Sequence, residues 1–230
     1  MTETLYQAAT LIIPLMLAIV FHEIAHGWTA KALGDPTAEE QKRLSLNPLR
    51  HVDPVGTIIV PGILKLVGAP VFGWAKPVPV NKWRLRNPRY GMMAVAAAGP
   101  GMNLALALLA AVCIGLIARP FVDGGQPSAV WIFVLLNLQN FLLINIFLAL
   151  FNLLPIPPFD GSHIVEGLLP PRAAATYERL RPFGFPLIFL LVIGLPMLVP
   201  GLSIVEKVVL PPVEWLHGIY FSVVSAVAGR

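Results

Sequence analysis

The chain has a single cysteine, Cys113, and very few charged residues. Asp, Glu, Lys and Arg make up 12% of its 230 residues, whereas an ordinary soluble domain has roughly 25%. One cysteine excludes a disulfide framework within the chain, and its position in an apolar run favours a small buried side chain. The formal net charge of +4 is too small to favour nucleic-acid binding. Because hydrophobic residues make up 57% of the chain, we predict an integral membrane protein.

The apolar residues form several long, separated runs, which favour transmembrane helices over the short alternating strands of a membrane barrel. The clearest runs cover about 5–33, 90–118 and 129–155, with one or two more at about 183–227. We expect an all-α polytopic membrane protein with about four to six transmembrane helices. The N-terminus lacks the basic region of a signal peptide, so the first span is expected to be retained. One membrane-embedded domain is expected over 1–230, with its core at about 5–170.

The segment at about 55–82 does not read as an ordinary span. Its first part is apolar but is interrupted by Pro61 and Gly62, and Pro77 and Pro79 exclude a helix interior from its second part. Lys and Arg gather on both sides of this segment and again at 172–181, and such residues mark cytoplasmic loops. This arrangement places the N-terminus outside and requires the segment to begin and end in the cytoplasm. We therefore expect a re-entrant or extended segment, with a complete second span as the alternative.

The first apolar run contains the stretch FHEIAHGW, which places His22, Glu23 and His26 in a membrane helix. Ionisable side chains are costly there and usually mark a function. On a helix, the two histidines lie one turn apart on the same face and can bind one metal ion, and Glu23 can reach a water molecule at that metal to accept its proton. A polar contact between helices is the alternative. His22 lies about 24 Å along the helix from Tyr6, which is close to the cytoplasmic face of a core about 30 Å thick.

A catalytic zinc site needs a third protein ligand and an open position. The candidates are Asp160, Asp53, His51, His163 and His217. Asp160 is favoured because the stretch NLLPIPPFDG ends a span in a proline-rich corner, at the depth predicted for His22; an ordinary surface turn is the alternative. For His163 we favour an exposed loop histidine over a metal ligand. His51 and Asp53 are more simply explained as residues that shape a polar loop than as a second metal site.

Taken together, HEIAH, AAAGPGMN and NLLPIPPFDG, in this order, resemble the site-2 protease family of intramembrane zinc metalloproteases. The resemblance covers most of residues 10–170, and FGWAKPVPVN is similar to the compact bacterial branch that lacks PDZ and CBS domains. It implies that His22, His26 and Asp160 bind one catalytic Zn2+ and that Glu23 is the catalytic acid and base.

Further residues also match positions of the family. The resemblance suggests that Asn103 hydrogen-bonds the substrate or its developing oxyanion, and that Asn152 ties the proline corner to a neighbouring helix. Polar contacts between helices are the alternative for both. A substrate helix must unwind to expose its carbonyl groups, and lipid offers no replacement partners. We expect Val78 and Val80 in the extended segment to supply some of them by strand addition.

The expected function is hydrolysis of peptide bonds in or near the transmembrane segment of a membrane-protein substrate. We expect the protein in the lipid bilayer of a bacterial cytoplasmic membrane, with its active site toward the cytoplasm; the sequence leaves its oligomeric state open. One alternative is a transmembrane metal-ion transporter, but the facing span LLNLQNFLLINIF has amides and no acid or histidine. The other is a non-proteolytic relative that only binds a membrane partner. A metalloprotease with a glutamate ligand would need Glu166 or Glu178, neither of which lies in the expected helical motif.

Overall fold

The computed structural model describes residues 2–68, 73–122, 124–199 and 201–229, and these residues form helices and connecting turns without a strand. The α-helices are α1 (Thr2–Ala32), α2 (Thr37–Glu40), α3 (Val60–Leu66), α4 (Pro88–Ala118), α5 (Ala129–Asn152), α6 (Asp160–Leu168), α7 (Pro171–Glu178), α8 (Gly184–Ile188), α9 (Leu195–Leu198) and α10 (Leu210–Ala228). π-Helical stretches lead into α3, join α8 to α9 and lead into α10: η2 (Pro54–Ile59), η6 (Phe189–Gly194) and η7 (Val205–Val209). Short 3-10 turns complete the described elements: η1 (Pro48–Arg50), η3 (Lys82–Arg84), η4 (Arg119–Phe121) and η5 (Arg181–Phe183).

Five helical segments of the described chain are long and apolar enough to cross a membrane. They are Leu5–Ala32, Pro88–Phe121, Ala129–Asn152, Pro171–Leu198 and Val205–Ala228. The predicted all-α polytopic class is therefore confirmed, with a number of candidate spans inside the expected range. Both apolar runs expected near the C-terminus are helical.

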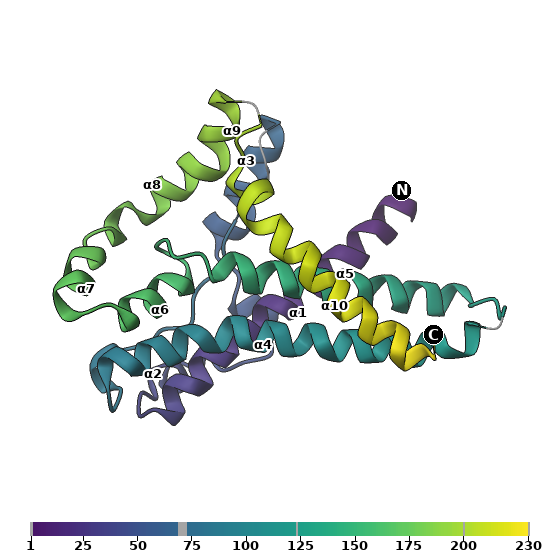
Figure 1. Cartoon of the computed structure of the whole chain (residues 1–230), viewed down its shortest axis with the longest axis horizontal. Helices are drawn as coiled ribbons and strands as arrows, with labels where there is room; N and C mark the ends of the chain where they lie inside the picture. Colours follow the sequence, from purple (N-terminus) through teal and green to yellow (C-terminus); the bar gives the residue numbers. More distant parts are fainter. Residues whose placement is uncertain (1, 69–72, 123, 200, 230) are drawn as a thin grey trace.

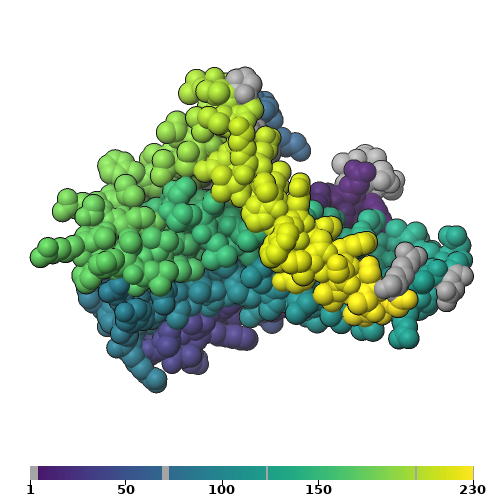
Figure 2. Space-filling view, viewed as in Figure 1, coloured from purple at the N-terminus to yellow at the C-terminus, as the bar shows by residue number. Residues whose placement is uncertain are grey.

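Helices α4 and α5 lie along one another, α1 runs obliquely behind them and packs on both, and α10 crosses α4 and α5 on the other side (Figure 1). In the space-filling view α10 runs diagonally over the face of the molecule (Figure 2). Small buried residues of α4, Ala107, Ala110 and Ala111, belong to the same core cluster as Leu142 and Ile146 of α5. Because alanine has a short side chain, it lets the backbones of neighbouring membrane helices approach closely.

The segment between α2 and α4 returns to the place where it begins. Its helical part, Pro54–Leu66, extends over only about 20 Å, which is too short to cross a core of about 30 Å. The Trp74 N–H donates to the Gly56 carbonyl at 3.1 Å, and the Thr57 hydroxyl donates to the Trp74 carbonyl at 2.9 Å. Residues 73–81 have no helix, and 69–72 lie outside the described residues. The segment is thus partly extended and turns back on itself, in agreement with the prediction, and its described residues contain no complete second span.

Asp35 fastens the extended residues beside α1. Its side chain is completely buried, and it accepts hydrogen bonds from the Asn81 N–H at 2.6 Å and from both the N–H and the hydroxyl of Thr37. Burial raises the pKa of the Asp35 carboxyl, but the hydrogen bonds from Thr37 and Asn81 outweigh burial and hold the pKa below its usual value. The ionised carboxylate therefore holds the loop after α1 to the end of the extended segment.

Candidate metal centre

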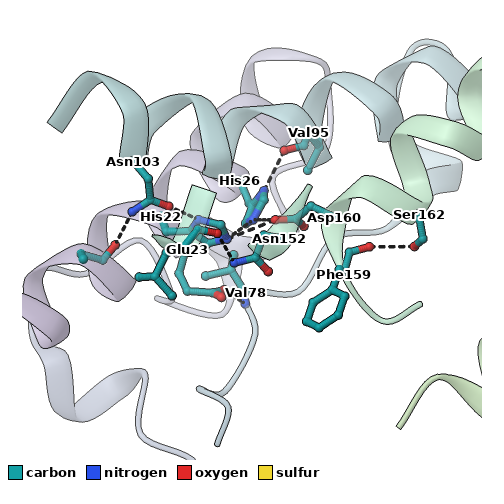
Figure 3. Close-up of polar contacts among 12 residues, drawn as sticks. His22, Glu23, His26, Val78, Val95, Asn103, Asn152, Phe159, Asp160 and Ser162 are labelled. Carbon is teal, nitrogen blue, oxygen red and sulfur yellow. Dashed lines mark hydrogen bonds and ion pairs between the residues drawn. The ribbon is translucent and has the colours of Figure 1, made fainter. Parts of the chain in front are cut away.

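His22 and His26 of α1 meet Asp160, the first residue of α6 (Figure 3). The two Nε2 atoms lie 3.0 Å apart, and Asp160 Oδ2 lies 3.2 Å from His22 Nε2 and 3.3 Å from His26 Nε2. Both imidazoles are buried, and Asp160 is largely so. Among the residues that the structure describes, this is the one group of three possible His, Cys, Asp or Glu ligands whose atoms converge.

The contacts behind the two imidazoles decide which ring nitrogen carries the hydrogen. His26 Nδ1 lies 2.7 Å from the Val95 carbonyl, and His22 Nδ1 lies 2.5 Å from Asn103 Oδ1. Both partners are oxygen atoms that only accept, so each Nδ1 is the donor. In the neutral imidazole the other nitrogen is then bare, and both bare Nε2 atoms point toward Asp160.

These three acceptor atoms fit a bound zinc ion. Asp160 Oδ2 is buried without a hydrogen-bond donor among the described residues, because the nearest nitrogens are the bare Nε2 atoms. Such crowding of acceptors is unfavourable unless a cation lies between them. Zinc binds nitrogen and oxygen at about 2.0–2.2 Å in tetrahedral sites, which places neighbouring ligand atoms about 3.3 Å apart. The observed separations of 3.0 to 3.3 Å agree with that spacing.

The proline-rich corner after α5 holds Asp160 in place. The hydroxyl of Tyr177, on α7, donates to the Pro155 carbonyl at 2.7 Å and ties the corner to the next helix. A Cβ on Gly161 would lie 2.5 Å from the Leu154 carbonyl oxygen, a separation that real side chains do not adopt. The glycine after Asp160 therefore lets α6 start directly against the corner, which directs Asp160 toward α1.

A second glycine, Gly99 of α4, makes room for the two imidazoles. A Cβ at this position would lie 2.5 Å from His26 Nε2 and 2.6 Å from His22 Cε1. The motif AAAGPGMN was recognised only by its resemblance to the family. Its first glycine has a physical reason in this structure, since the backbone of α4 packs directly on the metal-binding face of α1.

The Glu23 carboxylate lies beside the cluster and is held by the extended segment. Its Oε2 accepts a hydrogen bond from the Val78 N–H at 2.7 Å (Figure 3). The Val78 side chain is buried, and the Val80 side chain packs on a small cluster that α1 and α4 share. Val78 and Val80 therefore lie next to α1, and the backbone of Val78 directly contacts the candidate acid and base.

The asparagines differ in how they contact the site. Asn103 is completely buried and bonds His22 directly, while its Nδ2 donates to Asn145 Oδ1 at 2.7 Å and to the Ala18 carbonyl at 3.3 Å. Both hydrogens of this amide are thus engaged within the protein. Asn152 lies near Asp160 in the close-up, but its Nδ2 donates to a carbonyl of its own helix (Figure 3). Asn145 had no assigned role, because an amide in an apolar run gives no sign of its partner.

The other candidate ligands lie apart from the cluster. His163 was expected in an exposed loop, and this was wrong: α6 begins at Asp160, so His163 lies on that helix, partly buried. Its Nδ1 accepts from Arg181 at 3.0 Å, and burial together with the Arg181 charge lowers its pKa. His51 contacts a backbone carbonyl of its own loop, Asp53 caps the start of η2, and His217 lies on α10.

Comparison with known proteins gives consistent results. The model of a family described as peptidase family M50 matches residues 122–195. The candidate zinc metalloprotease YwhC of Bacillus subtilis is 37% identical over 195 residues, which cover 81% of each chain. The candidate zinc metalloprotease Rip2 is 31% identical over 187 residues in Mycobacterium tuberculosis and 28% over 178 residues in Mycolicibacterium smegmatis. In both, the chain spans 64% of the length of the relative. No solved structure matches the chain.

Proposed function

The chain belongs to peptidase family M50 as a zinc metallopeptidase of the site-2 protease type, and we propose that it cleaves peptide bonds in or near the transmembrane segments of other membrane proteins. The observation that carries this proposal is that two bare imidazole nitrogens on α1, a helix apolar enough to cross a membrane, converge with one carboxylate oxygen at the start of α6. A hydrolytic centre at that position acts on segments that are themselves in the bilayer.

His22, His26 and Asp160 are the proposed ligands of one Zn2+. Two neutral imidazoles and a carboxylate are a donor set that catalytic zinc sites use, with the fourth position left for water or substrate. When bound, zinc polarises a carbonyl group and lowers the pKa of water to about 7. The contacts of Nδ1 with Asn103 and Val95 keep the two rings oriented for this task.

Glu23 is the proposed acid and base. Its carboxylate takes a proton from the attacking water and then gives it to the nitrogen of the leaving peptide. The Val78 N–H holds Oε2, which fixes the direction of the carboxylate and leaves Oε1 as the atom to which we assign the proton transfer.

Val78 and Val80 are the proposed contacts for the unwound substrate. The segment that contains them is extended and lies against α1 next to Glu23. An unwound substrate strand needs hydrogen-bond partners, because lipid supplies none. We propose that such a strand pairs with this segment, and that the Val78 N–H changes partner between Glu23 and a substrate carbonyl.

The site is proposed to face the cytoplasm of a bacterial cell. His22 lies about 26 Å along α1 from Leu5, so it is in the C-terminal half of that candidate span, Leu5–Ala32. Lys31 lies in the last turn of α1, and three residues separate the basic η3 turn from the start of α4. Basic residues at this end of the helices are typical of the cytoplasmic side, where water can reach the site.

Comparative membrane proteomics tests the proposed reaction. Cells with the wild-type chain are compared with cells that carry Glu23→Gln, which keeps the three proposed ligands but lacks the base. Glu39→Gln is the matched control, since Glu39 is exposed and pairs with Lys31. We expect a membrane protein with a transmembrane segment to accumulate only with Glu23→Gln. Equal processing in all three strains would refute the catalytic assignment.

A further inference from the structure

Asn145 is a completely buried amide in the apolar helix α5, and the proposed reaction does not use it. An unpaired amide in this position would be costly, and the contacts of Asn145 lead directly to a proposed zinc ligand. We propose that Asn145 is a positioning residue that acts through Asn103 to keep the hydrogen of His22 on Nδ1, and so keeps Nε2 free to bind zinc. This inference rests on the proposed zinc site.

Three hydrogen bonds connect a backbone carbonyl of α5 to the ring of His22. Asn145 Nδ2 donates to the Phe141 carbonyl at 2.7 Å. Asn103 Nδ2 donates to Asn145 Oδ1 at 2.7 Å, and His22 Nδ1 donates to Asn103 Oδ1 at 2.5 Å. The three bonds join α5, α4 and α1 in a region that the core helices shield from solvent.

The Phe141 carbonyl gives this series of bonds its direction. A carbonyl oxygen only accepts, so Asn145 must point its NH2 group toward Phe141 and its Oδ1 toward Asn103. Asn103 must then point its NH2 group toward Asn145 and its own Oδ1 toward His22. Rotation of either amide by half a turn would place two oxygen atoms against each other without a hydrogen between them, at a cost of about 1–3 kcal/mol for the lost pairing.

Without the Asn145 oxygen, the orientation of Asn103 is less strongly fixed. A rotated Asn103 would present its NH2 group to His22 Nδ1, and the hydrogen of the neutral ring would move to Nε2. That hydrogen would point toward Asp160 and compete with zinc. The Ala18 carbonyl also accepts from Asn103, but at 3.3 Å, so it replaces the lost bond only in part. Outer contacts of metal-binding histidines change affinity by about 10–100-fold, and we expect about tenfold here.

Asn145→Leu tests the role of this side chain in the purified full-length protein. Asn137→Leu is a matched control on the same helix, because the Asn137 Nδ2 also donates to a carbonyl one turn earlier but its Oδ1 has no partner among the described residues. Zinc affinity is measured by competition with a chelator. We expect about tenfold weaker binding for Asn145→Leu and wild-type binding for Asn137→Leu. Equal affinities in the two variants would overturn the proposal.

Nitrogen NMR of the zinc-free wild-type protein gives a second test that does not depend on a variant folding. At a pH where both imidazoles are neutral, we expect the His22 hydrogen on Nδ1; a hydrogen on Nε2 would overturn the proposal. In Asn145→Leu we expect a mixture of the two forms. Failure of the wild-type chain to bind zinc would refute the proposed function, whereas normal zinc binding by Asn145→Leu would refute only the role of Asn145.

Discussion

Gly99→Ala is a small change with a large expected effect on the metal centre. The added Cβ would lie 2.5 Å from His26 Nε2 and 2.6 Å from His22 Cε1, whereas nonbonded carbon atoms prefer about 3.5–4.0 Å. The rings or the helix must therefore move by about 1 Å, while metal sites tolerate distance changes of about 0.2 Å. Overpacking of this kind costs about 1–3 kcal/mol. If the strain falls on the metal-bound arrangement, zinc binding weakens by about 5–150-fold.

Gly101→Ala separates this contact from the effect of alanine on helix stability. Both glycines lie in α4, and alanine favours a helix over glycine by about 1 kcal/mol. A Cβ on Gly101 would have no neighbour within 4 Å among the described residues. Zinc affinity by chelator competition should therefore fall for Gly99→Ala and stay at the wild-type value for Gly101→Ala. Equal zinc affinity in the two variants would refute the close contact between α4 and the two histidines.

Three further changes test other parts of the site. Val78→Pro removes the N–H that holds Glu23, so cleavage of a helix-bearing substrate should fall sharply. The control Val78→Ala keeps the N–H and should stay active. Equal activity of the two variants in a proteolysis assay would count against the proposed role. Gly161→Ala would place a Cβ against the Leu154 carbonyl oxygen, so both the thermal stability and the zinc content of the protein should drop. An unchanged melting temperature would contradict the close packing of α6 against the proline-rich corner. Asp35→Asn should lower stability by about 1–3 kcal/mol, because the asparagine amide has one oxygen and cannot accept both from Thr37 and from the Asn81 N–H. Because the folded pKa of Asp35 is depressed, its contribution in the wild type is present above the unfolded pKa and is lost as the pH falls through the folded pKa; melting curves against pH in which wild type and variant run parallel would refute this.

Hydrophobic runs were enough to predict the long helices, because lipid requires each crossing segment to satisfy its own backbone. The run at 129–155 corresponds to α5, Ala129–Asn152, and the proline-interrupted segment near 55–82 turns back on itself and is partly extended, in agreement with the expected re-entrant or extended segment. The short helices α6 and α7 were missed. They are not long apolar runs, and α6 begins immediately after a proline corner that reads as a surface turn.

The convergence of His22, His26 and Asp160 followed from motif spacing and resemblance, because HExxH places two side chains on one helical face. The contacts that support the metal ligands could not be predicted from the sequence. The bonds of Val95 with His26 and of Asn145 with Asn103 join helices whose relative rotation the sequence does not encode locally. The packing of α1, α4 and α5 against one another determines these hydrogen-bond partners.

Zinc content of three purified proteins tests the central claim most directly. Wild type, Glu23→Gln and Asp160→Ala are compared by metal analysis after the same purification, and each is assayed for proteolysis. We predict one zinc per chain in the wild type and in Glu23→Gln, with activity only in the wild type, and strongly reduced zinc in Asp160→Ala. Full zinc occupancy in Asp160→Ala, or proteolysis by Glu23→Gln, would contradict the assignment of these residues.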